Sequence, residues 1–406
     1  MRNWVILGAC ALTVAAQAAA PERWIASWGS AQQIPEEGNL LPQAAMQDVT
    51  LRQIVHLSAG GHKVRVRFSN TFGTQVLAID AAHVARSADK ANAHIVPGTD
   101  RPLTFDGRRT VSIPPGADYL SDPVALDAPA LSSLAVSIHL PQAPSGQTGH
   151  PPSRATSYYV HGDHSGDIDL PGAGKIDHWY QLSGVEVAAG PAAVAIVAFG
   201  DSITDGHGAT TNGDDRWPDI LAGRLQASPA TRHIAVVNVG IGGNHLLTDG
   251  LGPNALARLD RDVFARPGAK VMIMLEGIND LGKLSREDVR TPEMHKALVA
   301  DLIAAYRQVI ARAHGQGIRV IGGTITPYVG SDYYHPDGSS EADRQALNHW
   351  IRTSGAFDAV VDFDKVVRDP TRPERMMGPY DSGDHLHPSA AGYRAMADAI
   401  DLEMLR

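Results

Sequence analysis

Residues 194–206 read VAIVAFGDSITDG, an apolar run of strand length that ends in a polar turn bounded by glycine. Further apolar runs of this kind follow at 234–239, 271–275, 318–324 and 359–363. Between and after them lie segments of helix length, at 215–226, 255–264, 292–314, 340–353 and 388–405. Apolar strands that alternate with helices are typical of a parallel sheet covered on both faces. The sequence therefore predicts a three-layer α/β domain over residues 191–406.

The preceding half of the chain has a different pattern. Residues 24–187 contain short stretches of alternating apolar and polar residues, such as 64–68 (VRVRF) and 134–138 (LAVSI), separated by turns rich in Gly, Pro, Asn and Asp. Alternation with a period of two predicts half-buried antiparallel strands, and several in succession predict a β-sandwich. We therefore expect a β-sandwich-like domain over 21–188. The linker at 188–191 is too short to make the two domains independent.

The first twenty residues have the pattern of a secretory signal peptide. A basic start with Arg2 is followed by a short apolar run and by small residues before Pro21. We expect removal of residues 1–20, export to the periplasm or the medium, and no stable membrane insertion afterwards, because the apolar run is too short for a span. Lipid attachment at Cys10 is an alternative, but the apolar run continues past it. Cys10 is the chain's single cysteine, so the mature protein would have no disulfide.

The charge of the chain argues against nucleic acid as a partner. It contains 35 Lys and Arg against 44 Asp and Glu, a formal net charge of −9, without any run of basic residues. Proteins that bind phosphate backbones usually carry such a basic patch.

Polar or glycine-rich motifs follow the first two predicted strands of the α/β domain. Ser202 follows the first strand, at the edge of a parallel sheet where ligands bind. It is a candidate nucleophile, although Ser is also a common helix N-cap. The second strand leads into 240–244 (GIGGN), whose glycines could present N–H groups to an anion. A dinucleotide loop is disfavoured there, because Leu246 stands where a further Gly is needed.

Two more motifs complete the set. Asn279 follows the third strand and could donate a hydrogen bond to developing negative charge, or simply form an Asx turn. Asp384 and His387 lie three residues apart before the last predicted helix, so the carboxylate could hold one imidazole nitrogen while the other faces Ser202. Metal binding through His385 and His387 is the competing interpretation, but no third ligand is evident from the spacing.

Together, the Gly-Asp-Ser, Gly, Gly-x-Asn-Asp and Asp-x-x-His-Pro motifs resemble the block signature of the SGNH (GDSL-like) hydrolase superfamily. The resemblance covers residues 191–406. Within it, the stretch from Arg216-Trp217-Pro218 to the end also looks like a bacterial subgroup of aryl- and carbohydrate-esterases in which a β-rich domain precedes the hydrolase. The resemblance to the superfamily implies a flavodoxin-like α/β/α fold. Ile203 stands where the family name GDSL has Leu, and it is also apolar.

The resemblance also implies the roles of individual residues. Ser202 would be the nucleophile, and Asp384 and His387 would complete the catalytic group. The oxyanion hole would consist of the N–H groups of Ser202 and Gly243 and the amide of Asn279, with Gly242 as an alternative to Gly243. No cofactor and no metal is expected.

The expected function is that of an exported serine esterase that hydrolyses carboxylic esters through an acyl-enzyme. The substrates would be short-chain, acetyl-type esters of carbohydrates, polysaccharides included, or small aryl and alkyl esters. A lipase- or lysophospholipase-like enzyme for longer chains and a non-catalytic binding module are the alternatives. Aromatic residues could serve carbohydrate binding or packing: Tyr158, Tyr159, Trp179 and Tyr180 in the first half, and Tyr328, Tyr333 and Tyr334 after the fourth strand.

Overall fold

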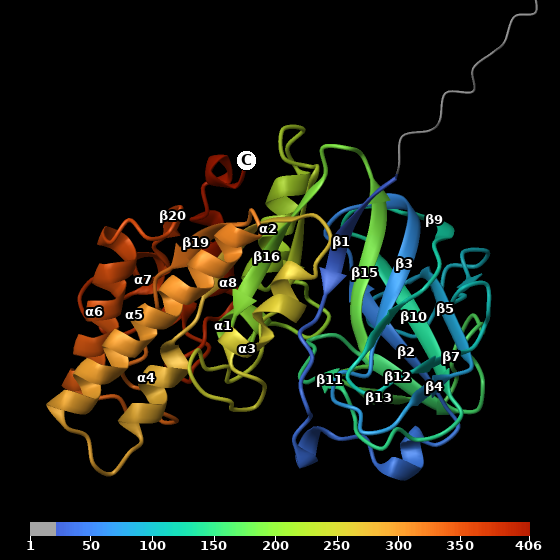
Figure 1. The fold of residues 1–406 in the computed structure, drawn as a ribbon, viewed down its shortest axis with the longest axis horizontal. Helices are drawn as coiled ribbons and strands as arrows, with labels where there is room; N and C mark the ends of the chain where they lie inside the picture. The colour runs from blue at the N-terminus through green and yellow to red at the C-terminus, as the bar shows by residue number, and fades with distance from the viewer. Residues whose placement is uncertain (1–21) are drawn as a thin grey trace, which may run out of the picture.

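The computed structural model describes residues 22–406, so the predicted signal peptide, residues 1–20, lies outside the described residues. Figure 1 shows two parts side by side, a β-rich part in blue and green and an α/β part in yellow to red. They meet in the centre of the molecule, where β1 (Arg23–Gly29) of the β-rich part contacts β17 (Ile234–Asn238) and β16 (Val194–Gly200) of the α/β part. Within residues 22–406, no helix is long and apolar enough to cross a membrane.

The β-rich part is a sandwich, as predicted. Among the described residues, one antiparallel sheet has the order β1-β15-β3-β8, with β9 also paired to β3, and the facing sheet has the order β13-β12-β2-β10-β5-β6. Along β3, the apolar side chains of Val64, Val66 and Phe68 are buried, and the residues between them are partly exposed. This alternation is what the sequence pattern requires of a strand with one face in the core.

The bounds of the sandwich elements are as follows: β1 Arg23–Gly29, η1 Glu37–Asn39, η2 Gln43–Met46, β2 Val49–His56, β3 Gly61–Ser69, β4 Leu77–Ile79, β5 Ala81–Arg86, β6 Arg101–Pro102, β7 Val111–Ile113, β8 Asp118–Leu120, β9 Val124–Ala128, β10 Ser133–Leu140, β11 Gly149–His150, β12 Ser157–His161, β13 Gly174–Ile176, β14 Trp179–Tyr180 and β15 Leu182–Ala189. Short strands pair as β4 with β7 and β11 with β14.

The α/β part contains a parallel sheet with the order β17-β16-β18-β19-β20. Its strands are β16 Val194–Gly200, β17 Ile234–Asn238, β18 Ala269–Leu275, β19 Arg319–Gly323 and β20 Ala359–Val361. The chain moves from β16 to β17 in one direction and from β17 through β18 to β20 in the other. Right-handed connections then place the intervening helices on opposite faces, which gives the predicted three layers.

The helices and turns of this part are α1 Ser202–Asp205, α2 Trp217–Gln226, α3 Ala255–Leu259, the π-helical turn η3 Asp260–Phe264, α4 Ile278–Ser285, α5 Pro292–Gly315, α6 Gly338–Thr353, α7 Phe363–Val367, η4 Gly378–Tyr380, α8 Ala390–Asp398 and η5 Leu402–Leu405. The single helix predicted over 388–405 is wrong, because α8 stops at Asp398 and a separate turn follows. Likewise, the segment 255–264 is α-helical only to Leu259. The short helices α1, α4 and α7 were not predicted, since so few residues carry no helical period.

The strand order reverses between β16 and its neighbours β17 and β18. In open parallel sheets, ligands bind at the carboxyl ends of the strands at such a reversal. Ser202 follows β16, and Asn279 lies four residues after the end of β18. The topology alone therefore brings these two side chains to the same edge of the sheet.

The sandwich and the α/β part share a continuous apolar core, which includes Ile25 of β1 and Val237 of β17. Polar contacts cross the boundary too. The buried Arg266 donates to the carbonyl oxygens of Ser183 (2.6 Å) and Ser30 (3.1 Å), and Val236 N–H donates to Ser58 Oγ (3.0 Å). The two parts are packed as one body, in keeping with the short linker.

Candidate active site

Ser202 is the first residue of α1, directly after β16. The N-cap role that a serine could have played belongs to Asp201, whose carboxylate accepts the N–H of Ile203 at 2.9 Å. The hydroxyl of Ser202 is thereby left for other partners. Its Oγ lies 2.8 Å from Nε2 of His387.

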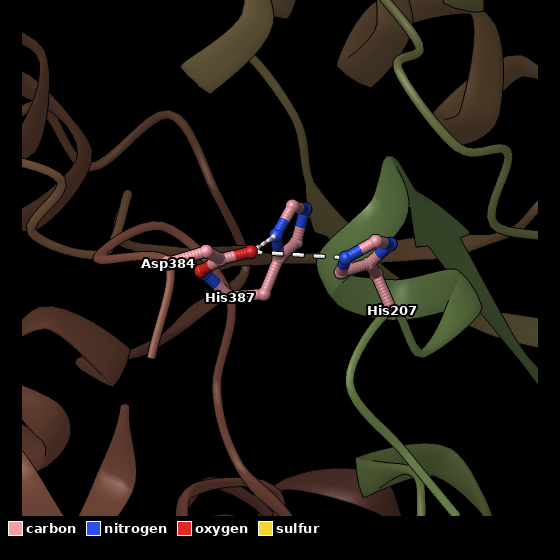
Figure 2. A group of neighbouring side chains, drawn as sticks. All are labelled: His207, Asp384 and His387. Carbon is pink, nitrogen blue, oxygen red and sulfur yellow. Dashed lines mark hydrogen bonds and ion pairs between the residues drawn. The ribbon is translucent and has the colours of Figure 1, made fainter. Parts of the chain in front are cut away.

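His387 and Asp384 form a pair in the loop before α8. Nδ1 of His387 lies 2.6 Å from Oδ2 of Asp384, and the other carboxylate oxygen accepts the backbone N–H of His387 at 2.8 Å. Figure 2 shows the two side chains facing each other. A carboxylate at Nδ1 requires a proton there, so Nε2 can accept the proton of Ser202. This is the geometry of a general base beside a nucleophile.

The pKa of Asp384 is held well below its usual range. Burial alone would raise this pKa, but the hydrogen bond and charge of His387, together with two backbone N–H groups, outweigh burial. The carboxylate is therefore ionised at neutral pH and can stabilise an imidazolium on His387.

Asn279, the second residue of α4, lies in the same cavity wall with its amide held in one orientation. Its Nδ2 donates to the carbonyl oxygen of Asn244 at 2.6 Å, and its Oδ1 accepts the hydroxyl of Tyr334 at 2.6 Å. These partners are distant in sequence, so the side chain is not spent on an Asx turn. Since Nδ2 carries two protons, one remains for a ligand.

Gly242 and Gly243 both line the cavity. Gly243 has a φ of +66°, a conformation that favours glycine, and a Cβ there would lie 2.9 Å from Leu251 Cδ1. Among the described residues, neither glycine N–H donates to a protein acceptor. Geometry thus allows either of them to serve as the donor.

His207 was missed by the sequence analysis. Its ring centroid lies 4.0 Å from that of His387, and its Nε2 lies 3.7 Å from Oδ2 of Asp384 (Figure 2). Burial, followed by the charges of His387 and Arg154, lowers the pKa of His207 to about 4, so the ring is neutral at neutral pH. In the sequence His207 directly follows the polar turn that ends at Gly206, but this position alone does not predict a contact with His387.

The competing metal interpretation through His385 and His387 does not fit the geometry. His385 Nδ1 is bound to Asp381 Oδ2 at 2.6 Å, and the ring nitrogens of His387 face Asp384 and Ser202. His207, Asp384 and His387 do offer ligand atoms within 4.8 Å of one another. His387, however, faces Ser202 Oγ with Nε2 and Asp384 with Nδ1, an arrangement that favours proton transfer over metal binding. The absence of a metal stays a prediction.

The ends of several strands are tied together beneath the site by Arg258, which is fully buried. It donates to the carbonyl oxygens of Gly200 (2.9 Å) and Val239 (2.6 Å) and to Oδ1 of Asn244 (2.8 Å). These residues follow or end β16 and β17, so one guanidinium fixes the loops that carry Ser202 and the glycines.

The site opens into a cavity of about 1160 Å³. The α/β part contributes Ser202, His207, Gly242, Gly243, His245, Asp249, Gly250, Leu251, Asn279, Lys283, Arg286, Glu287, Ser331, Asp332, Tyr333, Tyr334, Gly383, Asp384, Leu386 and His387. The sandwich contributes Gln33, Glu36, Asn39, Pro151 and Pro152. Tyr333 and Tyr334 thus reach the cavity, whereas Tyr158, Trp179, Tyr180 and Tyr328 are buried and serve packing.

Comparison with protein families supports the interpretation of Ser202, His387 and Asp384 as the site of a hydrolase. Residues 198–395 match the GDSL-like Lipase/Acylhydrolase family. The α/β domain belongs to the SGNH hydrolase superfamily. The chain is accordingly a carboxylic ester hydrolase. The SGNH domain begins near β16, and the sandwich precedes it.

Solved structures of low similarity cover about half of this chain. An acetyl xylan esterase, AlAXEase, is 20% identical over 51% of this chain and 97% of its own, with a TM-score of 0.38. An aryl esterase of M. smegmatis is 18% identical over 51% and 96%, with a TM-score of 0.38. A GDSL-like lipase from Bacteroides thetaiotaomicron is 18% identical over 52% and 87%, with a TM-score of 0.37. Likeness at this level supports no inference about substrate. A comparison with curated proteins gives no match.

Proposed function

We propose that the protein is an exported serine esterase for short-chain acyl esters of carbohydrates or of small aryl and alkyl alcohols. The observation that carries the catalytic part is the hydrogen-bonded series from Ser202 Oγ through His387 to Asp384, at 2.8 and 2.6 Å. A binding module that had lost catalysis would have no need to keep this series aligned.

The distances between these side chains support an acyl-enzyme mechanism. His387 Nε2 takes the proton of Ser202, and the Ser202 oxygen attacks the ester carbonyl to form a tetrahedral oxyanion. The N–H groups of Ser202 and of Gly242 or Gly243, with the Asn279 amide, would donate to that oxyanion. His387 then protonates the leaving alcohol. Water, deprotonated by the same imidazole, attacks the acyl-enzyme, and the acid leaves as Ser202 regains its proton.

The lining of the cavity favours substrates with short acyl groups and polar alcohols. Charged side chains line it, among them Glu36, Lys283 and Arg286, and its aliphatic side chains beyond proline are Leu251 and Leu386 within the described residues. A long acyl chain would need a continuous apolar trough. Tyr333, which is 61% exposed, offers a ring face of the kind that sugars stack on.

Initial rates on p-nitrophenyl esters from acetyl to decanoyl, below micelle formation, test the acyl preference. Each methylene buried in an apolar trough would contribute about 0.8 kcal/mol. We expect log kcat/KM to level off or fall beyond butyryl. A sustained rise through decanoyl would replace this proposal with the lipase-like alternative. Acetate release from acetylated xylan, measured in parallel, tests the carbohydrate substrate.

Export rests on the sequence pattern of residues 1–20 alone. Expression of the full chain in a bacterium with cell fractionation and N-terminal sequencing tests it. We expect activity in the periplasm or medium and a mature N-terminus near Pro21. An uncleaved chain retained in the cytoplasm would contradict this part of the proposal.

A further inference from the structure

A second histidine–aspartate pair joins the sandwich to the nucleophile helix. His150, in β11, has a fully enclosed ring that stacks on Trp179, with centroids 5.8 Å apart. Its Nε2 lies 2.8 Å from Oδ1 of Asp205, the last residue of α1, and its Nδ1 lies 2.8 Å from the carbonyl oxygen of Ala31. The side chains of His150 and Asp205 are only 3% and 6% exposed.

The partners of His150 fix its protonation. A carbonyl oxygen can only accept, so Nδ1 must carry a proton, and Nε2 faces a buried carboxylate. Burial lowers the pKa of His150, but the charge of Asp205 and the hydrogen bonds outweigh burial, so the pKa is raised overall. Arg216 opposes this rise, and His178 also lies close enough to feel the charge. The result is a buried ion pair that spans the two domains.

The helix at the other end of this pair is too short to hold itself. α1 consists of the single turn Ser202–Asp205, and a turn of this length has almost no intrinsic stability. Its position depends on the contacts at its ends. Asp201 caps the start, Asn238 Nδ2 donates to the carbonyl oxygen of Thr204 at 2.7 Å, and the ion pair with His150 holds the end.

We propose that His150 is a positioning residue for ester hydrolysis: through Asp205 it holds α1 so that Ser202 Oγ stays within hydrogen-bonding distance of His387. This inference rests on the proposed nucleophilic role of Ser202. The β-sandwich is then part of the catalytic apparatus rather than a separate binding module. The chain continues from His150 into Pro151 and Pro152, which line the cavity.

The test compares variants of the full mature chain that remove the His150–Asp205 interaction to different extents. H150F removes both hydrogen bonds, H150Q can keep one, and D205N keeps both without the ionic charge, since Asn can donate to Nε2 of a neutral ring. S58A is the matched control, because it removes the interdomain bond from Val236 N–H to a buried hydroxyl and does not touch α1. S202A serves as the inactive reference.

The measurements are kcat and KM on p-nitrophenyl acetate, the rate of covalent labelling of Ser202 by a fluorophosphonate, and thermal unfolding. A displacement of the nucleophile by about 1 Å can cost about 10²-fold. We expect losses of about 10²-fold for H150F and about 10-fold for H150Q, in kcat and labelling alike and with little change in KM. D205N, the conservative variant, should keep kcat and the labelling rate within about threefold of the wild type, because it retains both hydrogen bonds of His150. S58A should lower the unfolding temperature but not kcat.

The inference is overturned if folded H150F and H150Q turn over and label at the rate of S58A, or if only KM changes. If H150F does not fold, H150Q decides the question by the same criteria. A failure of the proposed function itself would look different: S202A would keep its turnover or its labelling, whatever the His150 variants do.

Discussion

A histidine–aspartate pair lies at each end of the helix that carries Ser202, and the two pairs have different tasks. His387 Nδ1 lies 2.6 Å from Asp384 Oδ2, and both side chains line the cavity. The second ring nitrogen of His387 faces the hydroxyl of Ser202. His150 and Asp205 are 2.8 Å apart and buried, and the second ring nitrogen of His150 faces a carbonyl oxygen. A hydroxyl can give up a proton, whereas a carbonyl oxygen cannot.

The partner of the second ring nitrogen of each histidine decides what chemistry its pair can perform. The same pairing recurs elsewhere in the chain, for example between His83 and Asp100 and between His314 and Asp358, and within residues 22–406 neither of these histidines is hydrogen-bonded to a serine. A histidine next to an aspartate is therefore weak evidence for catalysis. The third group, and its access to a cavity, carries the information.

The largest effect is expected from S202A. The hydroxyl is the attacking group and contributes little to packing, so hydrolysis should fall by at least about 10³-fold while the fold remains intact. Turnover on p-nitrophenyl acetate and circular dichroism check this. Retained turnover above about a hundredth of the wild type would reject the nucleophile and, with it, the distinction between the two pairs.

Replacing each aspartate by asparagine tests directly whether the two pairs differ in role. In D384N the amide would donate to Nδ1 of His387, which puts the proton on Nε2 and leaves no base for Ser202, so kcat should fall by about 10³- to 10⁴-fold. In D205N the corresponding tautomer still satisfies the carbonyl oxygen of Ala31, so the loss should be small. Equal losses in the two variants would show that the pairs do not differ in role.

A smaller effect is expected at the oxyanion hole, which neither pair touches. N279A should lower kcat by about 10²- to 10³-fold with little change in KM, because the hydrogen bond strengthens as charge develops on the substrate oxygen. Y334F removes a hydrogen bond that orients Asn279, worth about 1 kcal/mol or roughly fivefold in rate. An effect of N279A confined to KM would mean that Asn279 only positions the substrate.

The smallest effect is on stability, and it should have opposite pH dependence for the two pairs. The raised pKa of His150 means that its contribution is complete below the ordinary value of about 6.5 and declines as the pH rises through the folded value. The lowered pKa of Asp384 means that its contribution is present above about pH 4 and declines as the pH falls further.

Thermal unfolding between pH 4 and 9 measures this. The difference in melting temperature between the wild type and D205N should shrink towards alkaline pH, and that between the wild type and D384N should shrink towards acid. Parallel curves for the two variants would contradict the assigned protonation states.

Sequence reasoning succeeded where local pattern and topology agree. The ends of the strands in the parallel sheet lie within two residues of the predicted runs, because buried parallel strands are nearly continuous apolar segments. Ser202, Asn279 and His387 could be predicted to meet, because each follows a strand or precedes a helix at the same sheet edge. Domain limits, residue roles and export stay predictions.

The sequence could not reveal His207, Arg258 or His150 as parts of the site. Arg258 lies on a helix and bonds to carbonyl oxygens of distant loops, and backbone acceptors leave no trace in the sequence. His150 lies in the other domain, 55 residues before Asp205. Contacts of this kind depend on how the sandwich packs against the sheet, and no local periodicity encodes that packing.

The sequence by itself determined the order of the parallel strands and the longer helices, the two architectures and the residues able to carry out acyl transfer, because hydrophobic periodicity and side-chain chemistry are properties of the chain. The tertiary structure alone decided which histidine faces the nucleophile and which one is locked in a buried ion pair. It also decided that the sandwich forms part of the cavity wall. These outcomes depend on distances and on access to water, and both are set only when remote segments pack together.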